Sequence, residues 1–311
     1  MTTKYANAVA AAKAMENTLL NHNDMEQLIS ASGSSEIQAM ISAKKGGENQ
    51  SPESVWEFIR SCAPDSKELE ILLYRNDFHN LKAALKAMIA GRTAEKYYLR
   101  PSNLDLDLLY AVLSAKEYDS LPEYISKAAE EGYDILVKTS DGQLAESYID
   151  RAALEAMMKS AENTDSGFIK EYAGLITVCA DIKTAYRCCL MRKSRSFMES
   201  AVCGSKDLDK EYLINAAIDG MEALMNFLES SSYGDAARLL KESPAKFEKW
   251  CDDAVMELAA TARMQSFGAE PLAAYYIAAE AEQKNLRIIT VCREFGADRE
   301  TITERMRKLY V

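Results

Sequence analysis

The chain has 311 residues, of which 48% are apolar and 27% are charged, the balance of a folded globular protein rather than of a disordered, collagen-like or mucin-like chain. Acidic residues outnumber basic ones by 48 to 37, which gives a formal charge of −11. This sign argues against nucleic acid as a partner, because phosphate binding needs a basic surface.

Apolar residues recur with a helical period along almost the whole chain, and six prolines and thirteen glycines are few for this length. The segment from Tyr5 to Leu19 predicts a first helix, and the segment from Leu213 to Leu228 predicts another. Pro52 and Pro271 stand where a helix can begin, since the first turn does not need the missing N–H group. Asp298 is predicted to cap a last helix that runs to Tyr310.

The predicted connections are short. They run from Lys44 to Ser51 with Gly46 and Gly47, from Leu99 to Asn103, and from Cys203 to Lys206. Only residues 135–137, Ile-Leu-Val, hint at a strand, and three residues are too few to support a sheet. The sequence therefore predicts an all-α protein whose helices pack against one another.

The cysteines form no CxxC pair and no regular framework, and their number is odd: Cys62, Cys179, Cys188, Cys189, Cys203, Cys251 and Cys292. No basic segment followed by an apolar one opens the chain, so secretion is not expected. These features favour reduced thiols in a cytoplasmic protein. The apolar run from Tyr172 to Leu190 contains Asp181, Lys183 and Arg187, which argues against a bilayer span.

Three short segments share one pattern, a small polar residue followed by an aliphatic residue and a base. They are Asn80-Leu81-Lys82, Asp181-Ile182-Lys183 and Asn285-Leu286-Arg287, and they lie 101 and 104 residues apart. The first two segments add another base four residues later, at Lys86 and Arg187, where the third has Val291.

Two further matches support an internal repeat. The 104-residue offset also aligns Leu104-Asp105 with Leu208-Asp209, and a 199-residue offset aligns residues 28–41 with residues 227–240. Equal spacing of separate matches is what duplication predicts, although helix-rich segments can also match by chance. We therefore expect three helical units, at residues 1–100, 101–204 and 205–311.

Motifs for catalysis or cofactor binding are missing from the sequence. It contains no P-loop, and neither His22 nor His79 stands in a metal-binding spacing, so a structural hydrogen bond is the expected role of His79. Asp252-Asp253 lacks the third carboxylate of an isoprenoid-synthase motif and is interpreted as a solvated pair near a helix start. Cys188-Cys189 is interpreted as two small core residues. The sequence predicts no catalytic residue, no metal site and no cofactor.

The C-terminal part, from Glu270-Pro271-Leu272 through Asn285-Leu286-Arg287 to Val311, closely resembles the end of the C subunit of the V-type (archaeal and bacterial A/V-type) ATPase, a family that includes the eukaryotic d subunit. The segment from Tyr74 to Lys82 resembles the signature of that family's first unit, and the segment from Tyr5 to Glu16 resembles its first helix. The second unit departs from the pattern, because Asp181 replaces the amide found at Asn80 and Asn285.

The resemblance implies three similar helical units around a pseudo-threefold axis, forming a funnel. Its mouth would receive the central stalk, and its opposite face would rest on the membrane proteolipid ring. The implied function is that of a non-catalytic rotor socket on the cytoplasmic face of the membrane, which transmits torque for ion transport. The alternative from the residues alone is a generic helical-repeat scaffold for another protein partner.

The repeat residues are expected to hold neighbouring helix ends by hydrogen bonds rather than to contact partners. The expected set is Asn80, Lys82, Lys86, Asp181, Lys183, Arg187, Asn285 and Arg287. The four-residue spacing of Glu280 and Lys284 also places opposite charges on one helix face.

Overall fold

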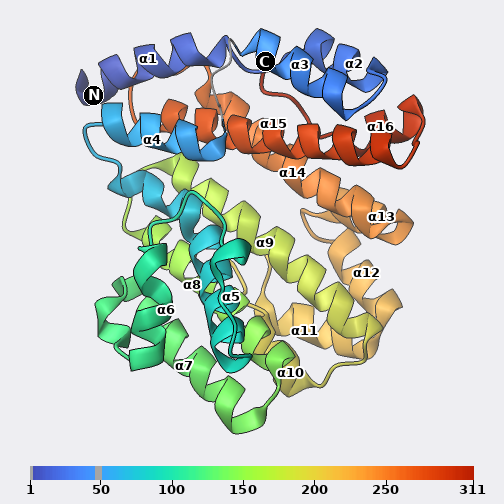
Figure 1. The fold of residues 1–311 in the computed structure, drawn as a ribbon. Coiled ribbons are helices and arrows are strands. Elements are labelled where there is room, and N and C mark those ends of the chain that lie inside the picture. Colours follow the sequence, from blue (N-terminus) through green and yellow to red (C-terminus); the bar gives the residue numbers. More distant parts are fainter. Residues whose placement is uncertain (1–2, 46–50) are drawn as a thin grey trace. The chain divides into compact units, whose positions relative to one another are not determined.

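A computed structural model describes residues 3–45 and 51–311 of the chain. These residues form α-helices and short 3₁₀-helices, and no strand occurs among them, which confirms the predicted all-α fold (Figure 1). The elements are η1 (Thr3–Tyr5), α1 (Ala6–Glu16), α2 (His22–Ser30), α3 (Ser34–Lys44), α4 (Pro52–Cys62), η2 (Lys67–Leu73), α5 (Tyr74–Ile89), η3 (Glu95–Tyr97), α6 (Leu106–Ala115), η4 (Tyr118–Ser120), α7 (Glu123–Thr139), α8 (Gly142–Glu162), α9 (Gly167–Leu190), α10 (Arg195–Ala201), α11 (Lys210–Asp219), α12 (Met221–Glu229), α13 (Gly234–Glu242), α14 (Pro244–Ala262), α15 (Glu270–Glu294) and α16 (Arg299–Arg305).

The helix starts predicted at prolines are confirmed. Ser51 is the N-cap of α4, where its side chain accepts from the N–H of Ser54, and Pro52 opens the helix. Pro271 stands in the first turn of α15. The N–H groups of a first turn have no partner within the helix, so proline costs nothing there.

One prediction about a single element is wrong, and one hint is not followed by the structure. Residues 135–137, which hint at a strand but are too few to support a sheet, lie in α7, because the helical period of that segment continues through them. The helix predicted from Leu213 to Leu228 is two helices, α11 and α12, separated at Gly220. Gly220 has φ 117°, a conformation that only glycine adopts at little cost, and the helix ends there.

The last helix is shorter than predicted. Asp298 is its N-cap, as expected, but α16 ends at Arg305 and not at Tyr310. The backbone N–H groups of Arg307 and Lys308 donate to the side chains of Asn285 and Asp253, so they are not free to continue a helical ladder. The predicted loop from Lys44 to Ser51 lies mostly outside the described residues, Gly46 and Gly47 included.

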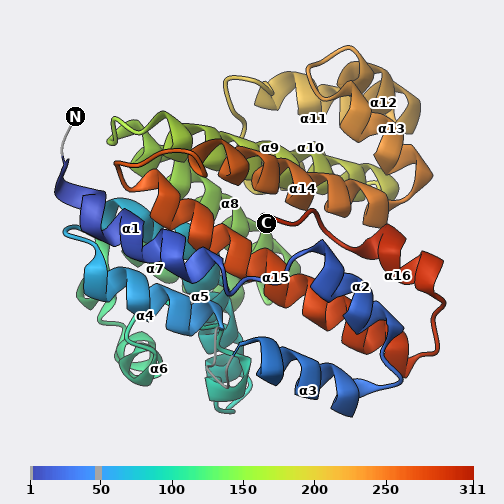
Figure 2. The ribbon, with the colours of Figure 1, turned by 90° about the horizontal axis from the view of Figure 1, so that it is seen from above.

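Contacts divide the chain into two compact units, of which unit one comprises residues 1–69 and 238–311. Its central element is α15, which packs against α1, α2, α3, α4, α14 and α16 (Figure 2). Every residue from Pro271 to Ala279 is buried, as expected of a helix that is apolar on all sides. Trp56 and Phe58 of α4 make edge-to-face contacts with Tyr276 and Tyr275 of α15 at centroid distances of 5.3 and 6.3 Å.

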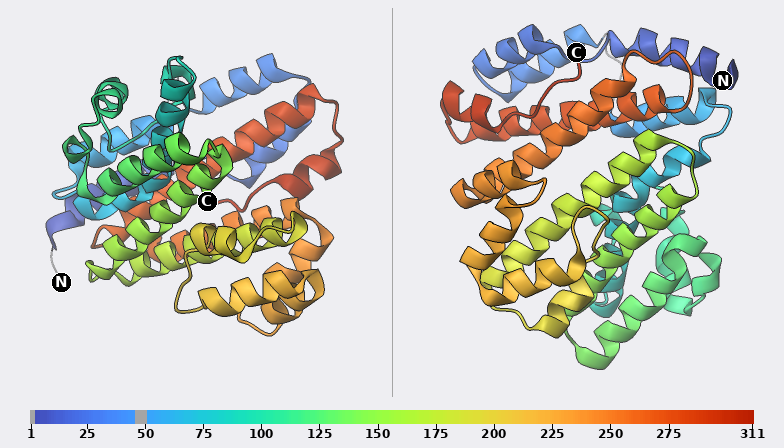
Figure 3. Two further views of the ribbon diagram at one scale, coloured as in Figure 1. Left: turned by 90° about the horizontal axis from the view of Figure 1, so that it is seen from below. Right: turned by 180° about the vertical axis from the view of Figure 1, so that it is seen from behind.

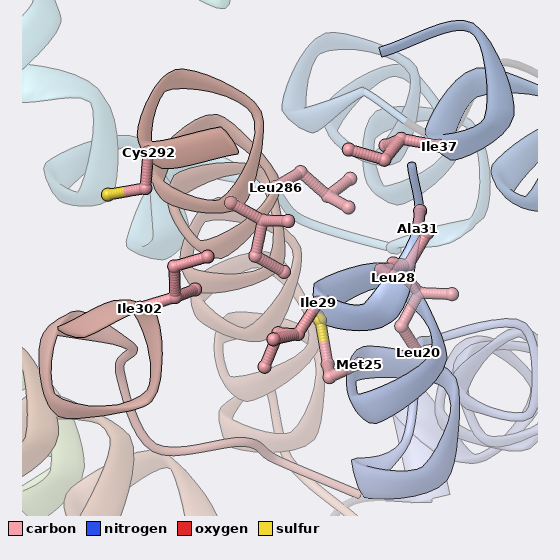
Figure 4. Close-up of a cluster of buried hydrophobic side chains, with 10 residues drawn as sticks. Leu20, Met25, Leu28, Ile29, Ala31, Ile37, Leu286, Cys292 and Ile302 are labelled. Carbon is pink, nitrogen blue, oxygen red and sulfur yellow. The ribbon is translucent and has the colours of Figure 1, made fainter. Parts of the chain in front are cut away.

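The far end of α15 joins segments from the two ends of the sequence. Buried residues of the α2–α3 region pack against residues of α15 and α16 in one apolar cluster (Figure 4): Leu20, Met25, Leu28, Ile29, Ala31, Ile37, Leu286, Ile289, Cys292 and Ile302. Segments far apart in the sequence therefore share one core, and unit one cannot form from either end of the chain alone.

Unit two comprises residues 70–237. In this unit α8 packs between α7 and α9 (Figure 3). Helix α5 packs against α6 and α8. Helix α9 also contacts α10, α11 and α12. Gly132 of α7 faces Ile149 of α8, where an added Cβ would stand 2.8 Å from the isoleucine side chain. The absence of a side chain at Gly132 lets these two helices approach closely.

Candidate functional site: three buried anchor residues

The first repeat residue, Asn80, lies in α5 with its side chain fully buried. Its amide nitrogen donates to the carbonyl oxygen of Leu99 at 2.9 Å, and its amide oxygen accepts from the N–H of Leu99 at 2.7 Å. Both polar ends of the side chain are therefore bonded to the backbone of one residue, which fixes the segment after η3 against α5.

Asn285 makes the same pair of hydrogen bonds in unit one. Its amide nitrogen donates to the carbonyl oxygen of Arg307 at 3.0 Å, and its amide oxygen accepts from the N–H of Arg307 at 2.7 Å. The side chain is fully buried in α15. Asn80 and Asn285 thus hold a returning chain segment by identical chemistry.

Asp181 of α9 also binds a returning segment, but with a different set of donors. Its two carboxylate oxygens accept from the N–H groups of Cys203 at 2.9 Å and of Gly204 at 2.7 Å. Two successive N–H groups thus turn toward one side chain, and the second belongs to Gly204, whose backbone is left-handed with φ 85°. An asparagine would point its NH₂ group at one of these donors, so this backbone calls for a carboxylate. The departure from the amide of the other two repeats has this physical reason. We name Asn80, Asp181 and Asn285 the anchor residues.

Burial has an electrostatic consequence at Asp181. Desolvation of the carboxylate raises the pKa of Asp181 to about 6, against the lowering effect of the two N–H groups and of Lys210. The neighbouring Cys203 thiol is also affected, since burial and the charge of Asp181 raise its pKa to about 12. Asp181 is therefore an anchor that changes charge in mildly acidic solution.

The helices that carry the anchors end in the same way. Eleven residues after each anchor the backbone is left-handed, at Gly91, Arg192 and Gly296, with φ values of 61°, 50° and 70°. The N–H group of the next residue donates to the carbonyl oxygen five residues before it, in the pairs Arg92–Ala87, Lys193–Cys188 and Ala297–Cys292, at 2.8, 3.0 and 2.9 Å. This is the Schellman arrangement of a helix C-terminus, present three times in one register.

A short helix follows each of these ends before the chain returns to its anchor. It spans seven residues in α10 and in α16 but three in η3. The return point is correspondingly nearer in the first case, at Leu99, than at Cys203 or Arg307 in the others. The three segments share one plan and differ in the length of one helix.

The remaining repeat residues lie on the surfaces of three different helices. Lys82 and Lys86 of α5 form ion pairs with Asp150 and Glu146 of α8, the second at 2.6 Å. Lys183 is partly exposed. Arg187 and Arg287 are exposed. The bases of the pattern thus differ from one another in exposure and in ion-pair partners, and the buried polar residue is the part of the pattern with a common geometry.

The other sequence matches also have structural counterparts. Asp105 and Asp209, aligned by the 104-residue offset, are the N-caps of α6 and α11. When 199 is added to their residue numbers, α2 and α3 align in sequence with α12 and α13. Both pairs consist of short helices that begin and end at nearly the same aligned positions. His79 makes a hydrogen bond of 3.1 Å with the carbonyl oxygen of Tyr97.

The interpretation of Asp252-Asp253 as a solvated pair near a helix start is wrong. Both residues lie in the middle of α14, and both bind the C-terminal segment. Asp252 accepts from Arg307 Nε at 2.7 Å and from Lys284 Nζ at 2.5 Å, and Asp253 accepts from the N–H of Lys308 at 2.6 Å. These long-range contacts leave no local sequence signal.

Two buried acidic residues next to anchors were missed from the sequence. Asp77 and Glu282 each stand three residues before an anchor, one turn away on the same helix. Asp77 accepts from the hydroxyl groups of Ser102 and Tyr124 at 2.6 and 2.7 Å, and burial raises its pKa. The shared spacing Asp-x-x-Asn and Glu-x-x-Asn is the signal that could have revealed them.

Glu282 is part of a buried ion pair. It accepts from Lys45 Nζ and from the N–H of Leu20, the latter at 2.5 Å, and both charged residues are largely inaccessible to solvent. This pair joins the end of α3 and the turn after α1 to α15.

The described part of the chain offers neither a metal centre nor a membrane-spanning helix. Among residues 3–45 and 51–311, no cluster of three or more histidine, cysteine or acidic side chains has the geometry to bind a metal ion. None of the helices in these two ranges combines the length and the apolar character that crossing a membrane requires.

The chain is similar in sequence to C subunits of V-type and A-type ATP synthases and ATPases. The model of the family described as "ATP synthase (C/AC39) subunit" matches residues 49–305. The C subunit of a V-type sodium ATPase from Enterococcus hirae is 24% identical over 266 residues, which cover 84% of this chain and 81% of the relative.

Two further relatives carry related names. The C subunit of an A-type ATP synthase from Methanocaldococcus jannaschii is 24% identical over 259 residues, covering 76% of this chain and 64% of the relative. The C subunit of a V-type ATP synthase from Thermus thermophilus is 25% identical over 138 residues, covering 43% of each chain.

Proposed function

The chain belongs to the ATP synthase (C/AC39) subunit family, and we propose that it serves as the rotor socket of a V-type ATPase or ATP synthase. In this role it joins the central stalk to the membrane proteolipid ring and carries torque between them. It binds no cofactor and catalyses no reaction, as a C subunit is a non-catalytic part of the rotary complex. The observation that carries the proposal is the family match over residues 49–305.

The proposed arrangement has three equivalent units, at residues 1–100, 101–204 and 205–311, around a pseudo-threefold axis. The three anchors support it, because each helix that carries one ends eleven residues later in the same left-handed turn. The three proposed repeats have other bounds than the two compact units. A repeat is defined by similar sequence, whereas a compact unit is defined by which residues pack together. A funnel built from such repeats would offer a mouth to the stalk and a base to the ring.

The buried anchors fit a part that resists torque. Each fixes a chain segment to a long helix by two hydrogen bonds inside the protein, where water does not compete for the donors and acceptors. A socket must transmit force without deforming locally. Hydrogen bonds that fix a loop to a helix resist such deformation. We place the chain peripherally, at the cytoplasmic face of the membrane, with no nucleic acid among its partners.

The test is a reconstituted rotary complex prepared with and without this chain. With the chain, the complex should couple nucleotide hydrolysis to ion transport. Without it, hydrolysis by the head should continue while transport stops. Transport that persists without the chain would exclude the socket role and leave a generic helical scaffold as the better account.

A binding measurement supplies the control. The purified chain should bind a stalk subcomplex and the purified ring separately, through broad interfaces of roughly 1,200–2,000 Å² in total. The chain alone should hydrolyse no nucleotide. Turnover that disappears with a point mutation in this chain would contradict the non-catalytic assignment.

A further inference from the structure

One end of unit two gathers elements from three parts of its sequence. Lys86, in the last turn of α5, pairs with Glu146 near the start of α8 at 2.6 Å. Lys193, just after α9, donates to Gln143 in the first turn of α8 at 2.6 Å. The C-terminal ends of α5 and α9 therefore lie beside the α7–α8 turn, the turn drawn in green at the bottom of Figure 1. We name these three pieces, residues 86–92, 134–146 and 187–193, the basic end of unit two.

Each of the three pieces exposes an aliphatic side chain. Ile89 at the end of α5 is 54% exposed, and Val137 in the last turn of α7 is 56% exposed. Leu190 and Met191 at the end of α9 are 60% and 54% exposed. Four exposed aliphatic side chains therefore lie on three neighbouring pieces of one end of unit two, where they are available to contact another surface.

The charge at this end is opposite to that of the whole chain. Six basic residues belong to it, namely Lys86, Arg92, Lys138, Arg187, Arg192 and Lys193, against three acidic ones, namely Asp134, Asp141 and Glu146. Two of the acids pair with Lys138 and Lys86, at 2.6 Å each, and Asp141 caps α8. The arginines at positions 92, 187 and 192 are exposed. In a chain of charge −11 this is a local positive surface.

We propose that the basic end of unit two rests on the anionic headgroups of a lipid bilayer, with its aliphatic side chains entering the interface. Basic residues are attracted to such a surface, and single aliphatic side chains gain from leaving water at its edge. The aliphatic residues stand on separate helix ends rather than along one groove. A fluid headgroup layer adapts to scattered side chains, whereas a folded protein partner needs a matching shape.

This contact is additional to the stalk and ring contacts proposed above. It does not depend on either, because a bilayer of lipid alone supplies the anionic surface. It would also steady a peripheral protein against tilting, since a second attachment adds to whatever protein interface is present.

The test is sedimentation of the full chain with vesicles made of equal amounts of phosphatidylglycerol and phosphatidylcholine, and with vesicles of phosphatidylcholine alone. Binding is expected to the first and not to the second, and to weaken as salt is added. Arg187→Gln should lower the partition coefficient about fivefold, the usual effect of one base near such a surface. Met191→Ser should lower it by a similar factor, since a buried aliphatic group is lost.

Matched variants in unit one serve as controls. Met264 is 89% exposed and Arg60 is exposed on α4, so Met264→Ser and Arg60→Gln remove the same groups elsewhere. They should leave vesicle binding unchanged. The proposal is overturned if the chain ignores anionic vesicles, or if the control variants weaken binding as much as the test variants. Neither result would bear on the socket, because the vesicles contain no ring or stalk.

Discussion

Asn285 holds Arg307 through both polar atoms of its side chain, donating to the carbonyl oxygen at 3.0 Å and accepting from the N–H at 2.7 Å. The two residues belong to α15 and to the C-terminal segment, and the amide is fully buried. The segment that ends the chain is thereby fixed to the central helix of unit one.

Replacing this amide by a carboxylate should destabilise unit one. In Asn285→Asp a carboxylate oxygen would face the carbonyl oxygen of Arg307, so one hydrogen bond is lost and a charge is buried beside an acceptor. The free energy of unfolding should fall by about 2–4 kcal/mol at neutral pH, as measured in urea. Acid should restore part of the loss, because the protonated carboxyl can donate to the carbonyl. Asn226→Asp, on the exposed face of α12, is the control and should change little.

Asp181 should give the protein a pH-dependent stability. Its pKa is raised to about 6 in the folded state, so the folded protein binds the proton more tightly than the unfolded chain does. The contribution of Asp181 to stability is therefore full below the unfolded pKa and is lost as the pH rises through about 6. Its total is about 3 kcal/mol, at 1.36 kcal/mol for each unit of pKa.

The measurement compares the unfolding free energies of the native chain and of Asp181→Asn between pH 4 and pH 7.5. The difference should shift in favour of the native chain as the pH falls across this range. A difference that stays constant would show that Asp181 titrates normally. This comparison uses only the change with pH, so the fixed cost of an asparagine facing two N–H donors does not affect it.

Arg192 should be a point of backbone strain. It occupies the left-handed position after α9 with φ 50°, where the other two repeats have Gly91 and Gly296. A residue with a Cβ is destabilised by about 1 kcal/mol or more in this conformation. Arg192→Gly should therefore raise the free energy of unfolding by about 1 kcal/mol, and the reciprocal Gly296→Arg should lower it by a similar amount. Arg192→Ala keeps the Cβ, and a gain of the same size in that variant would assign the effect to lost charge instead.

The buried pair of Lys45 and Glu282 should be sensitive to the loss of one member. Glu282→Gln leaves the ammonium group of Lys45 buried without a counter-ion, and the expected cost is about 3–5 kcal/mol. The double variant Lys45→Met with Glu282→Gln removes the unpaired charge while the glutamine oxygen can still accept from Leu20. It should recover most of the loss in thermal or urea unfolding. If it unfolds as readily as Glu282→Gln alone, the ion pair is not the source of the effect.

The sequence by itself determined the helical class and several helix starts, among them those at Pro52, Pro271 and Asp298. These follow from local causes: the spacing of apolar residues, proline in a first turn, and caps such as Ser51 and Asp298. The family resemblance was also readable from motifs at Asn80 and Asn285, and the family match confirms it. The similar spacing of the anchors, 101 and 104 residues, already predicted a common position in three segments.

Only the tertiary structure decided what the anchors hold and why the second one is an aspartate. The reason is the backbone of a distant segment: Leu99 and Arg307 each present an N–H and a carbonyl, whereas Cys203 and Gly204 present two N–H groups. The early end of α16 and the partners of Asp252 and Asp253 have the same origin, in contacts between residues 55 positions apart in the sequence. A residue's type limits which hydrogen bonds it can make, but the path of the folded chain selects the partner.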